Sequence, residues 1–226
     1  MNKEMAKQAK QIPFELPHKP SFDMADFIVS ASNEAAFSLI DSWPEWPHHA
    51  VALVGPKACG KTHLAKAWAS RANAIEYKAE DDIAVIPAGT SVLVEVLDVA
   101  KVNQETLFHL FNWSKETSGY LLITASIPPN RWDIGLPDLR SRLATLPVAE
   151  IVAPDDHLLM VLMAKLFADR QLQVDLEVID YILKRMDRSF VAAKALVELL
   201  DRHALADKRK ITKPLAKACL EELLDR

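Results

Sequence analysis

The chain has 226 residues, of which half are hydrophobic, so it can bury a sizeable core and exceeds one typical domain in length. Its formal net charge of −4 neither favours nor excludes nucleic acid as a partner. It has no apolar run near the ~20 residues of a membrane span, no apolar stretch typical of a secretory signal, and no cysteine spacing typical of a metal site. We therefore expect a cytoplasmic protein without a zinc site or a membrane contact, and with its two cysteines as thiols.

The first 20 residues are polar and interrupted by prolines, which predicts an extended N-terminal tail, residues 1–20. Within it, QIPFEL at 11–16 places a glutamine ahead of spaced apolar residues. An extended segment of this kind can dock on a partner, with the glutamine in a polar notch and the apolar side chains in a pocket. Packing of the segment on its own domain is the alternative. The candidate docking residues are Gln11, Ile12, Phe14 and Leu16.

Residues 21–152 alternate short apolar runs with stretches of helical periodicity. Continuous apolar runs predict buried strands, and their alternation with helices is typical of a parallel sheet covered on both faces. We therefore expect an α/β domain with a parallel five-stranded sheet flanked by helices. The expected strands are 51–54, 75–77, 92–96, 120–125 and 148–151, and the expected helices are 32–42, 61–71 and 103–117.

After Pro154 the apolar runs give way to helical periodicity alone. Acidic residues open the first of these stretches, and Thr212 with Pro214 is a typical helix start. Residues 153–226 are therefore expected to form a small all-helical domain. Its helices are expected at 155–170, 175–186, 189–206 and 212–224.

The sequence GPKACGKT at 55–62 matches the phosphate-loop pattern G-x-x-x-x-G-K-[ST] between a predicted strand and a predicted helix. Its glycines allow successive N–H groups to face a phosphate, and the helix N-terminus adds positive potential. Lys61 would reach the β- and γ-phosphates, and the hydroxyl of Thr62 would hold Mg²⁺. We expect ADP or ATP as the ligand. The candidate nucleotide-binding residues of the loop are Gly55, Pro56, Lys57, Ala58, Cys59, Gly60, Lys61, Thr62 and His63.

The predicted strand 91–96 ends with one acid where two are usual. In nucleotide-hydrolysing folds the terminal acid holds Mg²⁺ and the next acid activates the attacking water. Glu95 occupies the first place and is the candidate catalytic and Mg²⁺-holding acid, whereas Val96 occupies the second. Because valine cannot accept a proton, we expect intrinsic ATP hydrolysis to be weak or absent. Asp98 could substitute by a detour, and a solvated strand end is the ordinary alternative for both acids.

Several stretches along the chain resemble the DnaA-related AAA+ proteins, and most closely those of the short bacterial Hda type. The resemblance runs from about residue 11 to the C-terminus and implies a P-loop AAA+ domain followed by a helical lid domain. The stretches that carry it are QIPFEL, DFIVSASNEAA, GPKACGKTHLAKAW, LPDLRSRL, RMDRSF and LLDRHALADKRKIT.

The resemblance also implies roles for single side chains. It places Ile28 and Val29 against the adenine base, and Thr124 as the polar sensor of the γ-phosphate. Arg142 matches the arginine finger that acts in trans on another subunit's nucleotide, with Arg140 ranked second. Arg188 matches the second sensor arginine of the lid. The ordinary alternatives are, in the same order, core packing, a satisfied strand-end hydroxyl, a salt bridge from Arg142 to Asp138 and a solvated helix residue.

The partners follow from the same resemblance. QIPFEL resembles the peptide that binds the bacterial sliding clamp, and the family's implied target is DnaA. The chain stops at Arg226 without the helix-turn-helix domain of full-length DnaA, so we expect no sequence-specific DNA binding of its own. A homo-oligomer stays open.

The implied function is a nucleotide-bound regulator of replication initiation. Tethered to the DNA-loaded sliding clamp, it would stimulate hydrolysis of DnaA-bound ATP through Arg142 and so inhibit re-initiation. One alternative is a self-sufficient AAA+ ATPase, such as a helicase-loader-like protein, which needs a working water-activating acid. Another is a clamp-tethered scaffold that does not contact DnaA.

Overall fold

The computed structural model describes residues 23–78, 81–207 and 210–224 of the chain. These residues form two compact units. The first unit ends at Leu158 and the second starts at Leu159.

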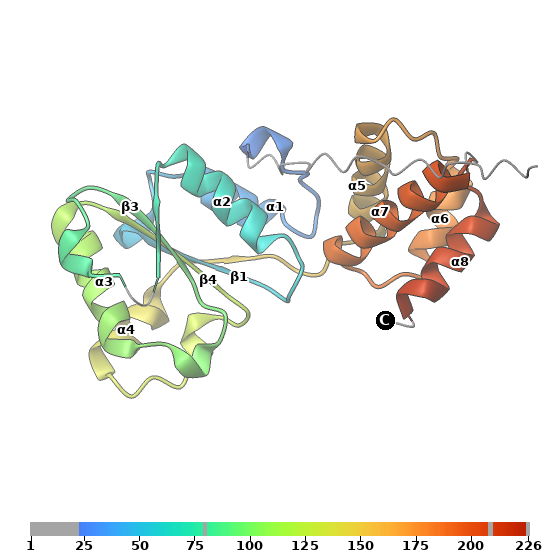
Figure 1. The fold of residues 1–226 in the computed structure, drawn as a ribbon. Coiled ribbons are helices and arrows are strands. Elements are labelled where there is room, and N and C mark those ends of the chain that lie inside the picture. Colours follow the sequence, from blue (N-terminus) through green and yellow to red (C-terminus); the bar gives the residue numbers. More distant parts are fainter. Residues whose placement is uncertain (1–22, 79–80, 208–209, 225–226) are drawn as a thin grey trace, which may run out of the picture. The chain divides into compact units, whose positions relative to one another are not determined.

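The first unit is built on a five-stranded parallel sheet with the strand order β2-β3-β4-β1-β5 (Figure 1). Each pair of neighbouring strands is parallel, so every connection crosses from one end of the sheet to the other. The predicted five-stranded parallel α/β fold is therefore confirmed. The strands are β1 (Ala50–Val54), β2 (Ile75–Tyr77), β3 (Ser91–Glu95), β4 (Tyr120–Ala125) and β5 (Val148–Glu150).

Helices cover both faces of this sheet. Along β1, Ala50, Ala52 and Val54 pack in the core that includes α3 and α4 residues, whereas Val51 and Leu53 pack in the core that includes α1 and α2 residues. This alternation is the two-residue period of a strand, and it explains why the buried strands are apolar at every position. Figure 1 shows α1 and α2 on one side of the sheet and α3 and α4 on the other.

The helices of the first unit agree with the predicted ones except for α4. Helix α4 was not predicted from the sequence. Pro137 nevertheless stands at its first position, where proline is common. Its buried apolar side chains are only Leu139 and Leu143, so its helical periodicity is weak. The helices are α1 (Glu34–Asp41), α2 (Lys61–Arg71), α3 (Gln104–Thr117) and α4 (Pro137–Thr145).

Short 3-10 helices, which the sequence did not predict, connect several of these elements. Three of them begin with an aspartate that caps a backbone amide two residues ahead, at Asp23, Asp82 and Asp98. The 3-10 helices are η1 (Met24–Asp26), η2 (Pro47–His49), η3 (Ile83–Val85), η4 (Val99–Lys101) and η5 (Pro129–Arg131).

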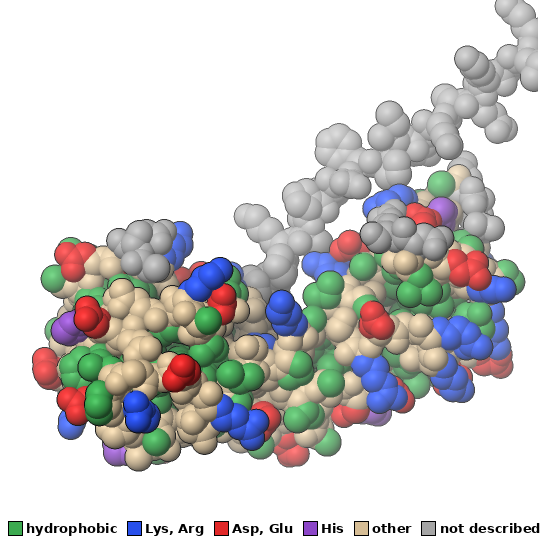
Figure 2. Space-filling model, turned by 90° about the horizontal axis from the view of Figure 1, so that it is seen from below, with side chains coloured by type: hydrophobic (Ala, Val, Ile, Leu, Met, Phe, Trp, Pro, Cys, Tyr) green, Lys and Arg blue, Asp and Glu red, His purple; other side chains and the backbone are tan. Residues whose placement is uncertain are grey.

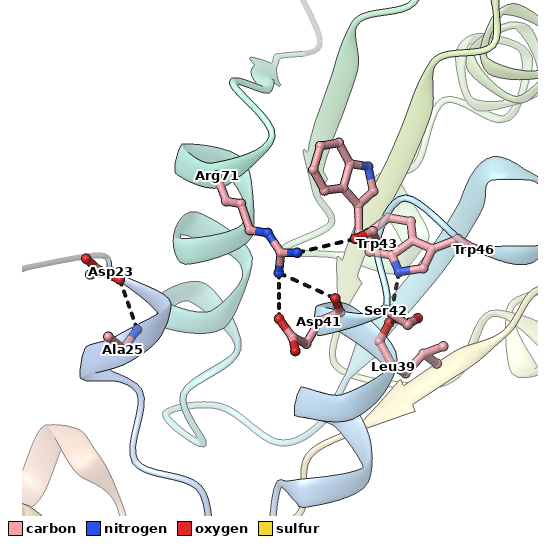
Figure 3. Close-up of polar contacts among 8 residues, drawn as sticks. All are labelled: Asp23, Ala25, Leu39, Asp41, Ser42, Trp43, Trp46 and Arg71. Carbon is pink, nitrogen blue, oxygen red and sulfur yellow. Dashed lines mark hydrogen bonds and ion pairs between the residues drawn. The ribbon is translucent and has the colours of Figure 1, made fainter.

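Arg71, in the last turn of α2, fixes the end of α1 (Figure 3). Its guanidinium lies 2.5 Å from the Asp41 carboxylate and also donates to the backbone carbonyls of Asp41 and Trp43, both at 3.4 Å. The indole N–H of Trp46 donates to the carbonyl of Leu39 at 2.8 Å, which closes the turn after α1. The Arg71 contacts hold the ends of α1 and α2 together, and the segment before α1 lies close to the start of α2.

The second unit is all-helical in its described residues. Its helices are α5 (Asp156–Asp169), which begins just before the boundary, α6 (Leu176–Leu183), α7 (Phe190–Asp207) and α8 (Lys213–Leu224). They share one apolar core that includes Met163, Ile182, Leu196 and Leu220. Each of the four helices predicted after Pro154 is present, which confirms the all-helical second part.

Charged side chains of both signs are mixed on the face shown in Figure 2. Both acidic and basic groups occur over each unit in this view. None of the helices in the described residues is long and apolar enough to cross a membrane.

Candidate functional site

The phosphate loop leaves the sheet at the carboxyl end of β1 and enters α2. Gly55 directly follows β1, and its N–H donates to the carbonyl of Ala125 at the end of β4, at 3.3 Å. A Cβ atom at Gly55 would lie 2.2 Å from the backbone oxygen of Ile151 and 2.9 Å from the sulfur of Cys59. Gly60, with φ of 100°, makes the left-handed turn into α2. Both glycines of the motif are thus required by backbone geometry.

Lys61 lies at the mouth of this loop. Its Nζ donates to the carbonyl oxygens of Gly55 and Pro56, both at 2.7 Å, so the ammonium group is held on the inner side of the loop. Thr62, the next residue, is exposed in the first turn of α2. The loop therefore presents a cation, a hydroxyl and a helix N-terminus together, which is the donor set that a nucleotide polyphosphate and its Mg²⁺ require.

Cys59 is a packing residue of the loop. Its side chain is buried, and this burial raises the pKa of the thiol above its usual value, although the Lys61 ammonium 3.9 Å from the sulfur acts in the opposite direction. A raised thiol pKa leaves little thiolate at neutral pH, so this cysteine is not an activated nucleophile. The remaining predicted loop residues, Pro56 and Lys57, are exposed, while Ala58 and His63 are partly buried.

The ends of β3 and β4 bring two predicted residues side by side. Glu95 and Thr124 are direct neighbours in the parallel register, with Thr124 buried and Glu95 exposed. Because β4 also pairs with β1, Glu95, Thr124 and the start of the phosphate loop share one edge of the sheet. No cluster of three or more His, Cys, Asp or Glu side chains suited to a metal occurs within residues 23–78, 81–207 and 210–224. A Mg²⁺ ion bound mainly to nucleotide phosphates needs only one or two protein oxygens, which Thr62 and Glu95 can supply.

Val96 is fixed by both its backbone and its side chain. Its N–H donates to the carbonyl of Thr124 at 2.8 Å, and its side chain packs against the core on the α3 and α4 face. The regular strand ends at Glu95, one residue earlier than predicted. The place expected for a water-activating acid therefore holds an apolar side chain that serves the core.

Asp98 does not continue the strand. It caps the 3-10 helix η4, with one carboxylate oxygen accepting from the N–H of Ala100 at 3.1 Å and the other 3.5 Å from the ammonium of Lys101. Both oxygens of Asp98 are thus engaged in a local turn.

The segment before α1 contacts the start of α2. The Phe27 ring packs edge-on against the ring of His63, with centroids 5.7 Å apart. Asn33 shapes this segment, because its side-chain amide donates to the carbonyl of Ile28 and accepts from the N–H of Ser30. Ile28 is partly buried and Val29 is 43% exposed, so this segment offers apolar surface close to the phosphate loop.

Arg142 lies on α4, which covers the sheet face opposite to α2. Its guanidinium carbon is 5.2 Å from the centre of the Phe108 ring on α3. Arg140, the second-ranked candidate, instead donates from Nε and Nη2 to the carbonyl of Ile134 at 2.9 and 2.6 Å. The guanidinium of Arg140 is therefore bound to the loop before its own helix.

Two further predicted sites belong to other parts of the chain. Arg188 is exposed in the turn between α6 and α7, within the second unit. The docking residues at 11–16 lie outside the described residues.

Sequence reasoning missed the residues that hold the Arg142 region in place. Gln104 and Phe108 of α3 contact the loop before α4 and Arg142 itself. Their partners are about 30 residues further along the chain, so no local pattern identifies them. Asn33 was missed as well, because it falls inside the predicted helix 32–42, whereas α1 begins at Glu34 with Asn33 as its N-cap.

Comparison with known proteins connects these features. Residues 155–220 match the family model described as Hda, lid domain. The chain is 26% identical over 234 residues to the chromosomal replication initiator protein DnaA of two Tropheryma whipplei strains, Twist and TW08/27, covering 90% of this chain and 49% of each relative. The chain thus spans about half the length of these relatives.

Solved structures of DnaA have the same fold. Domain III of the Thermotoga maritima replication initiation protein DnaA matches with a TM-score of 0.71 at 16% identity, covering 92% of this chain and 98% of that one. AMPPCP-bound DnaA from Aquifex aeolicus matches with a TM-score of 0.68 at 19% identity, covering 84% of this chain and 68% of that one. The chain therefore has an Hda-type lid at residues 155–220, and it is similar to DnaA in sequence and in fold.

Proposed function

We propose that the chain is a nucleotide-bound regulator that stimulates hydrolysis of ATP on DnaA while tethered to the DNA-loaded sliding clamp, and so prevents re-initiation of replication. The observation that carries this proposal is the contrast at one edge of the sheet. The phosphate loop has every part needed to hold a nucleotide, whereas Val96 fills the place of the water-activating acid and packs in the core. A chain built in this way holds its own nucleotide and acts on that of a partner.

For the chain's own nucleotide, ADP or ATP, several described residues are suitable. The loop N–H groups and Lys61 bind the phosphates, Thr62 and Glu95 hold Mg²⁺, and Thr124 lies beside Glu95 at the strand ends. The apolar surface of Ile28 and Val29 suits an adenine base, and Arg188 of the lid is the candidate for a further phosphate contact. The structural relative from Aquifex aeolicus binds AMPPCP, an adenine nucleotide analogue, which supports this ligand class.

The action on the partner is assigned to Arg142. A guanidinium delivered to a transferring phosphoryl group stabilises the charge that develops in the transition state, and this effect is worth about 10³–10⁵ in rate. Arg142 is partly exposed on α4, whereas Arg140 is bonded to the carbonyl of Ile134, which makes Arg142 the better candidate. The relationship of the chain to DnaA makes ATP-bound DnaA the proposed target.

The test is hydrolysis of ATP on DnaA in the presence of the chain, its nucleotide and clamp-loaded DNA. Arg142→Ala should lower the stimulated rate by about 10³-fold or to the unstimulated level. Arg185→Ala is the matched control, because Arg185 also lies over an aromatic ring, Tyr181, but in the lid. Unchanged stimulation by Arg142→Ala would refute the proposal, and rapid ATP turnover by the chain alone, lost in Lys61→Ala, would favour a self-sufficient ATPase.

Attachment to the clamp is tested separately. Replacing Gln11 and Phe14 together with alanine should abolish clamp binding, because the polar anchor and the largest apolar anchor are both lost. Thermal unfolding of the variant should match that of the parent protein. Full retention of this variant on immobilised clamp would show that residues 11–16 do not form the clamp-binding peptide.

A further inference from the structure

One face of α3 carries two contacts that bear on the position of Arg142. Gln104 and Phe108 are four residues apart in this helix, so they lie on the same face, one turn from each other. Gln104 contacts the loop before α4, and Phe108 contacts Arg142 on α4. We call these two residues with their partners the α3–α4 contact.

Gln104 binds the backbone of the loop that leads into α4. Its Oε1 accepts hydrogen bonds from the N–H groups of Gly135 and Leu136, at 3.0 and 3.2 Å, and its Nε2 lies 3.4 Å from the carbonyl oxygen of Asp133. Leu136 is the residue that caps α4, so Gln104 fixes the point where this helix begins.

The same loop is also held from α4 itself. Arg140 donates twice to the carbonyl of Ile134, between the residues that Gln104 binds. The loop is thus fixed from both sides. The direction and register of the first turn of α4 are therefore set by Gln104 and Arg140 together.

Phe108 acts on the side chain of Arg142. The guanidinium carbon lies 5.2 Å from the ring centre, within the range of an attractive cation–π contact. A free arginine side chain samples many rotamers, and a contact with a fixed ring reduces that number. Phe108 is itself partly buried and packed against the core, so the ring is a rigid support.

We propose that Gln104 and Phe108 are positioning residues for Arg142: Gln104 sets the start of α4, and Phe108 keeps the guanidinium extended for delivery to the partner's nucleotide. This inference rests on the proposed function, because it assigns how the arginine finger is prepared. A charged group that is already held in its active orientation stabilises the transition state more strongly. The rate of hydrolysis then rises, while the affinity for the partner stays the same. Loss of the α3–α4 contact should therefore lower the maximal stimulated rate of hydrolysis. It should have less effect on the concentration of the chain that gives half-maximal stimulation.

Four variants of the full chain test the inference. Phe108→Leu removes the ring but keeps an apolar side chain, whereas Phe108→Trp keeps a ring for the guanidinium. Gln104→Leu removes the acceptor, whereas Gln104→Glu keeps an oxygen for the two N–H groups. Each is compared with the parent protein, with Arg142→Ala and with the control Arg185→Ala.

The first measurement needs no partner protein. In nuclear magnetic resonance spectra, Phe108→Leu should move the Nε–H signal of Arg142 away from its ring-shifted position. Hydrogen exchange at Gly135 and Leu136 should become faster in Gln104→Leu and stay near that of the parent in Gln104→Glu. Unchanged signals and exchange would mean that the α3–α4 contact does not hold these groups, and the inference would fail at this step.

The second measurement is the stimulated hydrolysis of ATP on DnaA with clamp-loaded DNA. Phe108→Leu should lower the maximal rate about two- to fivefold and Gln104→Leu about three- to tenfold, with half-saturation unchanged and with Phe108→Trp and Gln104→Glu close to the parent. A higher rate in Phe108→Leu would mean that the ring withholds the finger, and a change in half-saturation alone would make Phe108 a partner contact. Either result overturns the inference while the proposed function stands. If Arg142→Ala also leaves the rate unchanged, the proposed function itself fails.

Discussion

The carboxyl ends of β1 and β3 lie on the same edge of one sheet, yet they are built for different tasks. After β1, the glycines, the lysine and the helix start are all in place, and Gly55 fits so closely that a Cβ atom would overlap the carbonyl of Ile151. After β3, the acid Glu95 is followed by Val96 in the core and by Asp98 in a local turn. One strand end is complete for holding a phosphate, and the other lacks the group that would activate water.

The difference shows how binding and hydrolysis can be separated within one fold. Binding depends on backbone N–H groups and on one lysine, which the geometry of the loop supplies. Hydrolysis depends in addition on a general base or a water-orienting residue, which is worth about 10²–10⁴ in rate. A strand end of the first kind can hold a nucleotide without hydrolysing it, and Arg142 lies on the sheet face opposite to α2.

The largest effect is expected from Gly55→Ala. The added Cβ would lie 2.2 Å from the Ile151 carbonyl, so the loop must move and its N–H groups lose their common direction. We expect nucleotide affinity to fall at least about 100-fold, as measured by calorimetric titration with ADP. Gly135→Ala is the control, since a Cβ there meets its nearest atom, Oε1 of Gln104, at 3.7 Å, an ordinary contact distance. Equal affinity of both variants would show that the loop does not set nucleotide binding.

An attempt to restore the missing acid gives the next largest effect. Val96→Asp places a carboxylate where the parent side chain packs against the core, which should lower the free energy of unfolding by about 1–3 kcal/mol in urea denaturation. Because the side chain at position 96 is directed into that core, ATP turnover should stay at the level of the parent. Val96→Thr, of nearly the same shape, should cost less stability. A rise in turnover for Val96→Asp would mean that position 96 faces the nucleotide after all.

Most of the fold followed from the sequence because its signals are local. Continuous apolar runs between helical stretches predicted the parallel sheet, and the phosphate-loop motif predicted its own position between β1 and α2. The end of β3 was placed one residue too late, since the apolar character of Val96 continues past the last regular strand residue. Helix α4 was missed because two buried leucines in nine residues give little periodicity.

The candidate site was predictable only in part, for a related reason. Lys61 followed from the phosphate-loop motif and Glu95 from the end of a predicted strand, whereas Thr124 followed from the resemblance to a known family. The structure places all three at one edge of the sheet. The contact of Arg140 with the carbonyl of Ile134 requires the turn before α4, and the sequence did not predict this helix. The support of Arg142 by Phe108 depends on how α3 packs beside α4. This second contact joins residues distant in sequence, and no spacing rule encodes it.

The smallest effect is expected at Asp98, the acid nearest to the missing one. Asp98→Ala removes the cap of η4 and an exposed ion pair with Lys101, which together should lower the free energy of unfolding by about 0.5–1 kcal/mol. If Asp98 only stabilises this turn, Asp98→Asn should recover most of that loss, because its side-chain oxygen can still accept from Ala100. Residual ATP turnover should be the same in all three proteins when measured by release of inorganic phosphate. A loss of turnover in both variants would instead show that Asp98 takes the role of the acid missing at Val96. The end of β3 would then have a water-activating acid after all, placed later in the chain than expected.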